Sequence, residues 1–140
     1  MVVHFPIALW TLGTCFDLAV LAGWPQFWQP AGQLILIGLA IGVLSGIAGA
    51  IDFVAMSDDE AAQDTAMKHM MLMGTAWSIY LFAYLLRLEA GSMAPEPSLM
   101  PALLSLAGFL TMAAGAHYGG ALIYTHGVGV VLKKNTSRKG

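Results

Sequence analysis

Four long apolar blocks, separated by short polar connections, make up most of the chain. They cover residues 2–23, 31–56, 65–88 and 99–124. A helix of roughly 20 mostly apolar residues crosses the hydrocarbon core of a bilayer, so each block is long enough for one span. The pattern therefore predicts an all-α fold, a four-transmembrane-helix up-and-down bundle in residues 1–132. A basic C-terminal tail follows in residues 133–140.

The connections carry turn and interface chemistry. The first, "GWPQFWQP", combines prolines with aromatic rings that prefer the headgroup zone. The second, "SDDEAAQD", places carboxylates at the start of the third helix, where the helix dipole favours them. The third, "EAGSMAPEPS", ends the third helix with two prolines. In the fourth block, Gly119 and Gly120 indicate a bend, with a straight overlong helix as the alternative.

Composition supports a membrane protein. The chain has 140 residues, of which 58% are hydrophobic and 10% are charged, and its mean hydropathy is +0.73. A soluble domain has about 25% charged residues, so this chain could not cover a water-exposed surface. The length leaves no room for a separate soluble domain. We expect the first block to be a retained span, because it lacks a basic leader and contains Asp17.

The basic residues predict the orientation. Four lie in the tail, namely Lys133, Lys134, Arg138 and Lys139. The opposite side of the bundle offers only Arg87. Because Lys and Arg are retained in the cytoplasm, both termini are expected to be cytoplasmic.

A stripe of small residues on the second block predicts close helix packing. It consists of Gly38, Gly42, Gly46 and Ala50. Small residues repeated every four positions let another backbone approach closely in a membrane. We expect this stripe to face a neighbouring helix.

Polar residues within the apolar blocks are the candidates for function. Counting along an up-and-down bundle brings all four histidines to one membrane face: His4, His69, His117 and His126. Asp52 belongs to that face, whereas Asp17 lies towards the other. Taken singly, such groups often rest at headgroup level. Their convergence favours function, because ionisable residues are costly in a membrane.

The surroundings of His117 suggest a bound flat group. Its neighbours at three and four positions are all small: Ala113, Ala114, Gly120 and Ala121. A haem requires imidazoles from facing helices with space beside them, and His69 and His117 fit that arrangement. We therefore expect His117 to face the interior within reach of His69. A magnesium macrocycle, another metal, or plain helix packing through the small residues are the alternatives.

Several motifs resemble a known family. "VHFPIALW", "AGAIDF", the histidine that opens the third helix, and "GGALIYTHGVGV" are similar to those of the bacterial membrane proteins called Domain of Unknown Function 2231. The resemblance covers nearly the whole chain. It implies a multi-pass protein of the bacterial inner membrane, sometimes joined to Rieske-type iron–sulfur domains and distantly like four-helix b-type cytochromes. The matching positions are His4, Asp17, Asp52, His69, His117, Tyr124 and His126.

These features predict a small subunit of a respiratory or photosynthetic redox complex. It would bind b-type haem through His69 and His117 and exchange electrons with quinone. His4 and His126 are further ligand candidates, and Asp17, Asp52 and Tyr124 would support the ligands.

Two alternatives remain open. One is an accessory subunit of a larger membrane assembly that has no cofactor of its own. The other is a subunit that contacts (bacterio)chlorophyll. A metal-dependent enzyme is disfavoured, because the chain has no HExxH or nucleophile motif. The expected partners are the lipid bilayer, other membrane subunits and quinone, and no nucleic acid.

Overall fold

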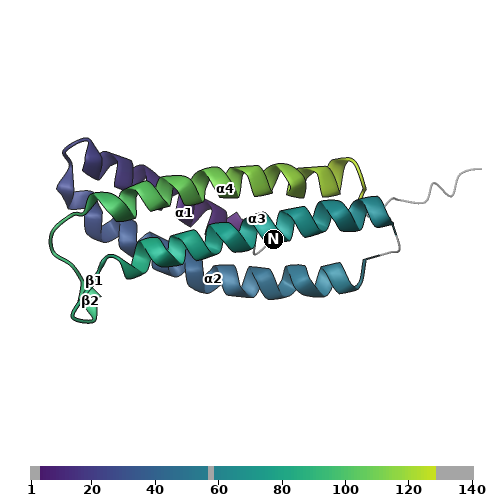
Figure 1. The fold of residues 1–140 in the computed structure, drawn as a ribbon, viewed down its shortest axis with the longest axis horizontal. Helices are drawn as coiled ribbons and strands as arrows, with labels where there is room; N and C mark the ends of the chain where they lie inside the picture. The colour runs from purple at the N-terminus through teal and green to yellow at the C-terminus, as the bar shows by residue number, and fades with distance from the viewer. Residues whose placement is uncertain (1–3, 57–58, 129–140) are drawn as a thin grey trace, which may run out of the picture.

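The computed structural model describes residues 4–56 and 59–128, and this part is a bundle of four antiparallel helices (Figure 1). The helices are α1 (His4–Leu21), α2 (Trp28–Val54), α3 (Glu60–Leu85) and α4 (Leu99–Tyr124). The all-α prediction is confirmed. The predicted tail, residues 133–140, lies outside the described residues.

The connections contain two features that the sequence pattern did not predict. A 3₁₀ turn, η1 (Pro25–Phe27), leads from α1 into α2. Between α3 and α4, strand β1 (Leu88–Glu89) pairs with β2 (Ser92–Met93) in a small antiparallel hairpin. Ala90 and Gly91 form its turn with φ of 50° and 82°, a region in which glycine is favoured. We call this side of the bundle the hairpin end and the opposite side the open end.

Helix α3 begins earlier than the apolar pattern predicted, at Glu60 instead of residue 65. Asp59 is its N-cap, and its Oδ1 accepts hydrogen bonds from the N–H groups of Ala61 (3.0 Å) and Ala62 (3.2 Å). Such a cap satisfies donors that the first helical turn would otherwise leave unpaired. The acidic connection therefore belongs largely to the helix.

Glycines on α4 bring it close to α3. A Cβ added at Gly108 would lie 3.0 Å from the ring of Tyr80, and one at Gly115 would lie 3.0 Å from the sulfur of Met73. Gly119 faces the imidazole of His69 in the same way. Close approach of this kind is the usual role of small residues in membrane helices. Helix α4 runs without interruption through Gly119 and Gly120 to its end at Tyr124, so these glycines do not end the helix.

The core lies towards the hairpin end. Trp10 of α1 is 2% exposed, and its ring stacks on that of Tyr80 with centroids 4.8 Å apart. Gly38 and Gly42 of α2 lie directly against Trp10, so the first half of the small-residue stripe faces a side chain of α1. At Gly46 an added Cβ would meet no atom within 4 Å.

The last stripe residue, Ala50, is also exposed, because α1 does not extend to the open end. Helix α1 has 18 residues and α2 has 27, which correspond to about 27 and 40 Å at 1.5 Å per residue. Figure 1 shows α1 alongside only the part of the bundle nearer to the hairpin. The open end is therefore built from three helices.

Among the described helices, three are long and apolar enough to cross a membrane: His4–Leu21, Pro25–Val54 and Leu99–Tyr124. Helix α3 is the exception to the predicted four spans. Its first half carries Asp64, Lys68 and His69, and its apolar part is limited to residues 70–85.

Candidate functional site

A groove opens between α2 and α3 at the level where α1 begins. Its volume is about 380 Å³. Two tryptophan rings, Trp10 and Trp77, and the sulfurs of Met70 and Met73 form apolar walls, and Gly46 leaves one side flat. Val43, Gly46, Gly49 and Gly74 line the groove and are exposed, so the groove is open to its surroundings. Its size is that of a typical small-molecule pocket.

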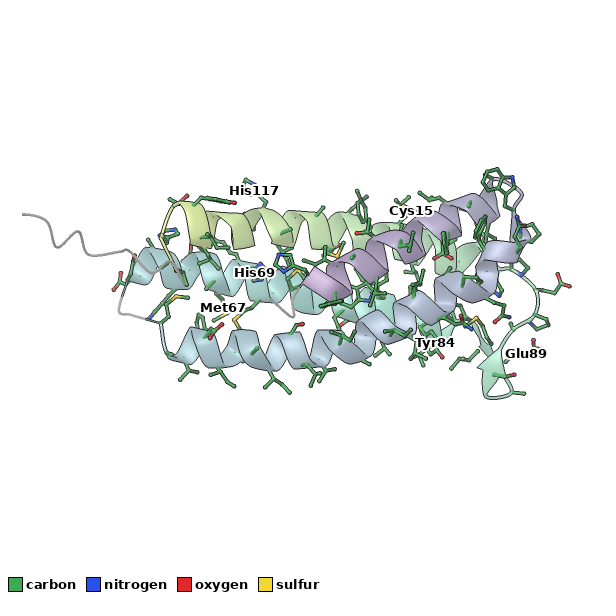
Figure 2. The ribbon with its side chains drawn as sticks, turned by 180° about the vertical axis from the view of Figure 1, so that it is seen from behind. Cys15, Met67, His69, Tyr84, Glu89 and His117 are labelled. Carbon is green, nitrogen blue, oxygen red and sulfur yellow. The ribbon has the colours of Figure 1, made fainter. Side chains whose placement is uncertain are left out.

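His69 is the ionisable residue that lines this groove. Its Nδ1 lies 2.8 Å from the carbonyl oxygen of Gly115 on α4, a hydrogen bond that fixes the orientation of the ring. Gly119 makes room for the same ring, because a Cβ there would lie 3.0 Å from Cε1 of His69. Figure 2 shows His69 in the interior, close to the start of α1. Helix α4 therefore holds the imidazole in place beside the groove.

His117 does not meet His69, and the expectation that it faces the interior is wrong. Figure 2 shows it on the side of α4 that faces away from the other helices, and its side chain is exposed. The reason is helix periodicity. Gly115 and Gly119 are four residues apart and both face α3, so the intervening position is rotated to the opposite side. The small neighbours of His117 leave space outside the bundle.

His126 joins the ends of α3 and α4 instead of lining the groove. Its Nε2 is 3.3 Å from the hydroxyl oxygen of Thr65, and its Nδ1 is 4.0 Å from Oδ2 of Asp59. His126 thus contacts both the N-cap of α3 and its second turn. This arrangement fastens the end of α4 to the start of α3.

The other predicted residues are dispersed. His4 is exposed at the first turn of α1, and Asp52 is exposed near the end of α2. Tyr124 is 90% exposed. In the described part of the chain, no three His, Cys, Asp or Glu side chains lie close enough together to hold a metal ion. The predicted convergence at one membrane face does not produce one cluster, because α1, with His4, begins beside the middle of the bundle (Figure 1).

At the hairpin end, Asp17 forms a buried ion pair that the sequence analysis missed. Its Oδ2 accepts a hydrogen bond of 2.5 Å from Nη2 of Arg87, and both side chains are 0% exposed. The guanidinium also lies 4.3 Å from the centre of the Trp28 ring, a cation–π contact. The signal was present in the sequence, because Asp17 and Arg87 were the two opposite charges assigned to that side.

A second polar group lies next to this pair in the core. The hydroxyl groups of Thr14 and Tyr80 are 2.8 Å apart, and Thr14 also reaches the carbonyl oxygen of Ser105 at 3.3 Å. All three residues are buried. These contacts tie α1 to α3 and α4, so they have a structural explanation.

Taken together, the fold and the apolar composition define an α-helical membrane protein. The particular family follows from the family comparison. The model described as "Predicted membrane protein (DUF2231)" matches residues 1–132, and the chain belongs to this family. No curated protein and no solved structure matches the chain.

Proposed function

We propose that this membrane protein is a small redox subunit that binds a lipid-soluble quinone in the groove beside His69. The observation that carries the proposal is the groove itself. It is apolar, suited in size to a small ring, open to its surroundings and supplied with one fixed imidazole. A quinone ring needs apolar walls, a polar contact and an exit for its isoprenoid tail, and such sites are mostly apolar with few polar groups.

The reaction in such a subunit is a two-electron exchange. Quinol loses two electrons and two protons as it becomes quinone. The electrons pass to a metal-containing redox partner of the assembly, and the protons pass to water. The resemblance of the chain to proteins that occur with iron–sulfur modules supports a partner of this class.

The proposed membrane arrangement has four crossings, with α3 packed along α4. Its glycine-mediated packing against α4 supports this placement, because α4 is itself long and apolar enough to span. Both termini are then on the cytoplasmic side, as the basic tail indicates. Cysteine labelling tests the arrangement in a Cys15→Ser background: Thr136→Cys reacts from the cytoplasm and Ser92→Cys from the opposite side. The reverse pattern would contradict the orientation.

A b-type haem on His69 is the second candidate. The hydrogen bond from Nδ1 to the Gly115 carbonyl favours it, since ligating histidines usually donate their other N–H to such a group. The predicted pair of ligands does not fit, because His117 is exposed on the outer side of α4. Of the two predicted ligands, His69 alone could therefore bind the haem iron. A Soret band that disappears in His69→Ala but persists in His117→Ala would support this candidate.

The quinone proposal predicts saturable binding at the groove. We expect decylubiquinone, added to the protein in nanodiscs, to quench the fluorescence of Trp10 and Trp77, which line the groove. Gly46→Leu should weaken binding at least about tenfold, a loss of roughly 1.4 kcal/mol. The leucine side chain would fill the groove. It should not clash with the bundle, because a Cβ added at Gly46 meets no atom within 4 Å.

The matched control is Ile47→Leu on the next, outward position, which is 55% exposed and outside the groove lining. It should bind decylubiquinone like the wild type. Equal affinity in Gly46→Leu and Ile47→Leu would place the quinone elsewhere. If neither quinone nor haem binds the wild type, the redox proposal is wrong and the accessory role is the better description.

A further inference from the structure

We infer that the groove binds the reduced, hydroxyl-bearing form of its ligand in preference to the oxidised form. This inference rests on the proposed function and names the form of the quinone that the site retains. It follows from an inventory of the hydrogen-bonding groups on the groove walls. Four lining residues have a side chain with an N–H or O–H group: Trp10, Ser45, His69 and Trp77.

Two of these donors are committed to backbone carbonyl groups. The hydroxyl of Ser45 donates to the carbonyl oxygen of Ile41 at 3.2 Å. The indole N–H of Trp77 donates to the carbonyl oxygen of Leu39 at 3.1 Å. Neither group is left to donate to a molecule in the groove.

The indole N–H of Trp10 is buried against α2. A Cβ added at Gly38 would lie 2.5 Å from Nε1 of Trp10, so this nitrogen lies against the Gly38 backbone. Gly38 is not part of the groove lining. Nε1 has no hydrogen-bond partner among the described residues, but its position directs the N–H away from the groove.

His69 then determines the polarity of the site. A carbonyl oxygen can only accept, so the bond between Nδ1 and Gly115 requires the proton on Nδ1. In a neutral imidazole this leaves a lone pair on Nε2. Among the described residues Nε2 of His69 has no hydrogen-bond partner. Of the lining side chains, His69 therefore supplies an unbonded acceptor, and no lining side chain supplies a free donor.

A ligand that donates a hydrogen bond matches this polarity. A quinol hydroxyl can donate to Nε2 of His69, whereas a quinone carbonyl would place its own lone pair against that of the imidazole. His69 is part-buried, so the hydrogen bond that the quinol makes and the quinone lacks should contribute about the net value of an ordinary hydrogen bond, roughly 0.5–1.5 kcal/mol. The proposal concerns binding alone and requires no transfer of electrons.

The test compares two forms of one ring at a fixed pH of about 8. Decylubiquinol, kept reduced under anaerobic conditions, should compete with bound decylubiquinone and bind about tenfold more tightly. The dimethyl ether of decylubiquinol has the same ring without O–H groups and should bind about tenfold more weakly than the quinol. A tenfold preference for quinol also raises the midpoint potential of the bound two-electron couple by about 30 mV.

Two variants show whether His69 is responsible. An amide both donates and accepts, so His69→Gln should reduce the preference for quinol to less than about twofold while the groove still binds the ring. His126→Gln, which lies outside the groove lining, should keep the full preference. Circular dichroism should show that both variants are folded, so that a lost preference reports on binding and not on folding.

The outcomes separate the inference from the proposed function. If quinone binds the wild type as tightly as quinol, or more tightly, the inference is wrong while the quinone site stands. If the dimethyl ether binds as well as the quinol, the hydroxyl contact is absent and the inference is again wrong. If no form binds, both proposals are overturned.

Discussion

Replacing Asp17 by asparagine is expected to lower the free energy of unfolding by about 3–5 kcal/mol. The carboxylate and its partner Arg87 are both fully buried, and their contact is 2.5 Å long. The amide would leave the guanidinium charge uncompensated in the protein interior. Nε and Nη1 of Arg87 already have no hydrogen-bond partner among the described residues, so no other group replaces the lost carboxylate.

The control is Asp64→Asn, which removes a carboxylate from an exposed ion pair. Asp64 and Lys68 are 2.6 Å apart on the surface of α3, and their side chains are 63% and 52% exposed. An exposed pair of this kind contributes at most about 1 kcal/mol. Thermal unfolding in detergent should therefore show a large decrease in Tm for Asp17→Asn and almost none for Asp64→Asn. Equal shifts would mean that the buried pair has no special role in stability.

Much of the fold could be predicted from the sequence because helix-forming apolar blocks are a strong signal. Block lengths predicted the four helices, and all four occur. The ends were less certain, as the early start of α3 at Glu60 shows. That start depends on the Asp59 cap, a local hydrogen bond that hydrophobicity does not report. The β1–β2 hairpin likewise depends on positive φ at two residues and not on apolar patterning.

The candidate site was only partly predictable. Counting residues along each helix gives depth in the membrane, and it correctly placed His117 at the level of His69, since Gly115 bonds to His69. Depth counting does not give the direction in which a side chain points around the helix. The spacing of Gly115 and Gly119 contained that information, because two glycines four residues apart mark the face that packs closely. They indicate a contact face from which His117 is excluded.

The groove could not be predicted from any single segment of the sequence. Its walls come from α1, α2 and α3, and it exists because α1 begins beside the middle of its longer neighbours. Trp10 and Trp77 are ordinary apolar residues in the sequence. Their role as walls follows only from the packing of Trp10 on Gly38 and Gly42 and from the bond of Trp77 to Leu39.

Trp10→Ala is expected to cost about 3–5 kcal/mol of unfolding free energy, the range for truncating a buried large aromatic side chain. Trp10 is 2% exposed, stacks on Tyr80 and fills the space beside Gly38 and Gly42. Gly38 and Gly42 have no side chains that could move into the cavity left by the Trp10 ring. The surrounding helices can therefore close that cavity only partly. Trp24→Ala is the matched control, because Trp24 is 57% exposed and lies outside the core cluster.

The same substitution should also affect the groove, since Trp10 forms one of its walls. Trp10→Phe retains an aromatic ring and should recover most of the stability that Trp10→Ala loses. Thermal unfolding in detergent compares the three variants, and decylubiquinone binding in nanodiscs reports on the wall. We expect weaker binding in Trp10→Ala and wild-type affinity in Trp24→Ala. A stable Trp10→Ala protein would show that α1 packs on α2 without needing this ring, contrary to the core described above.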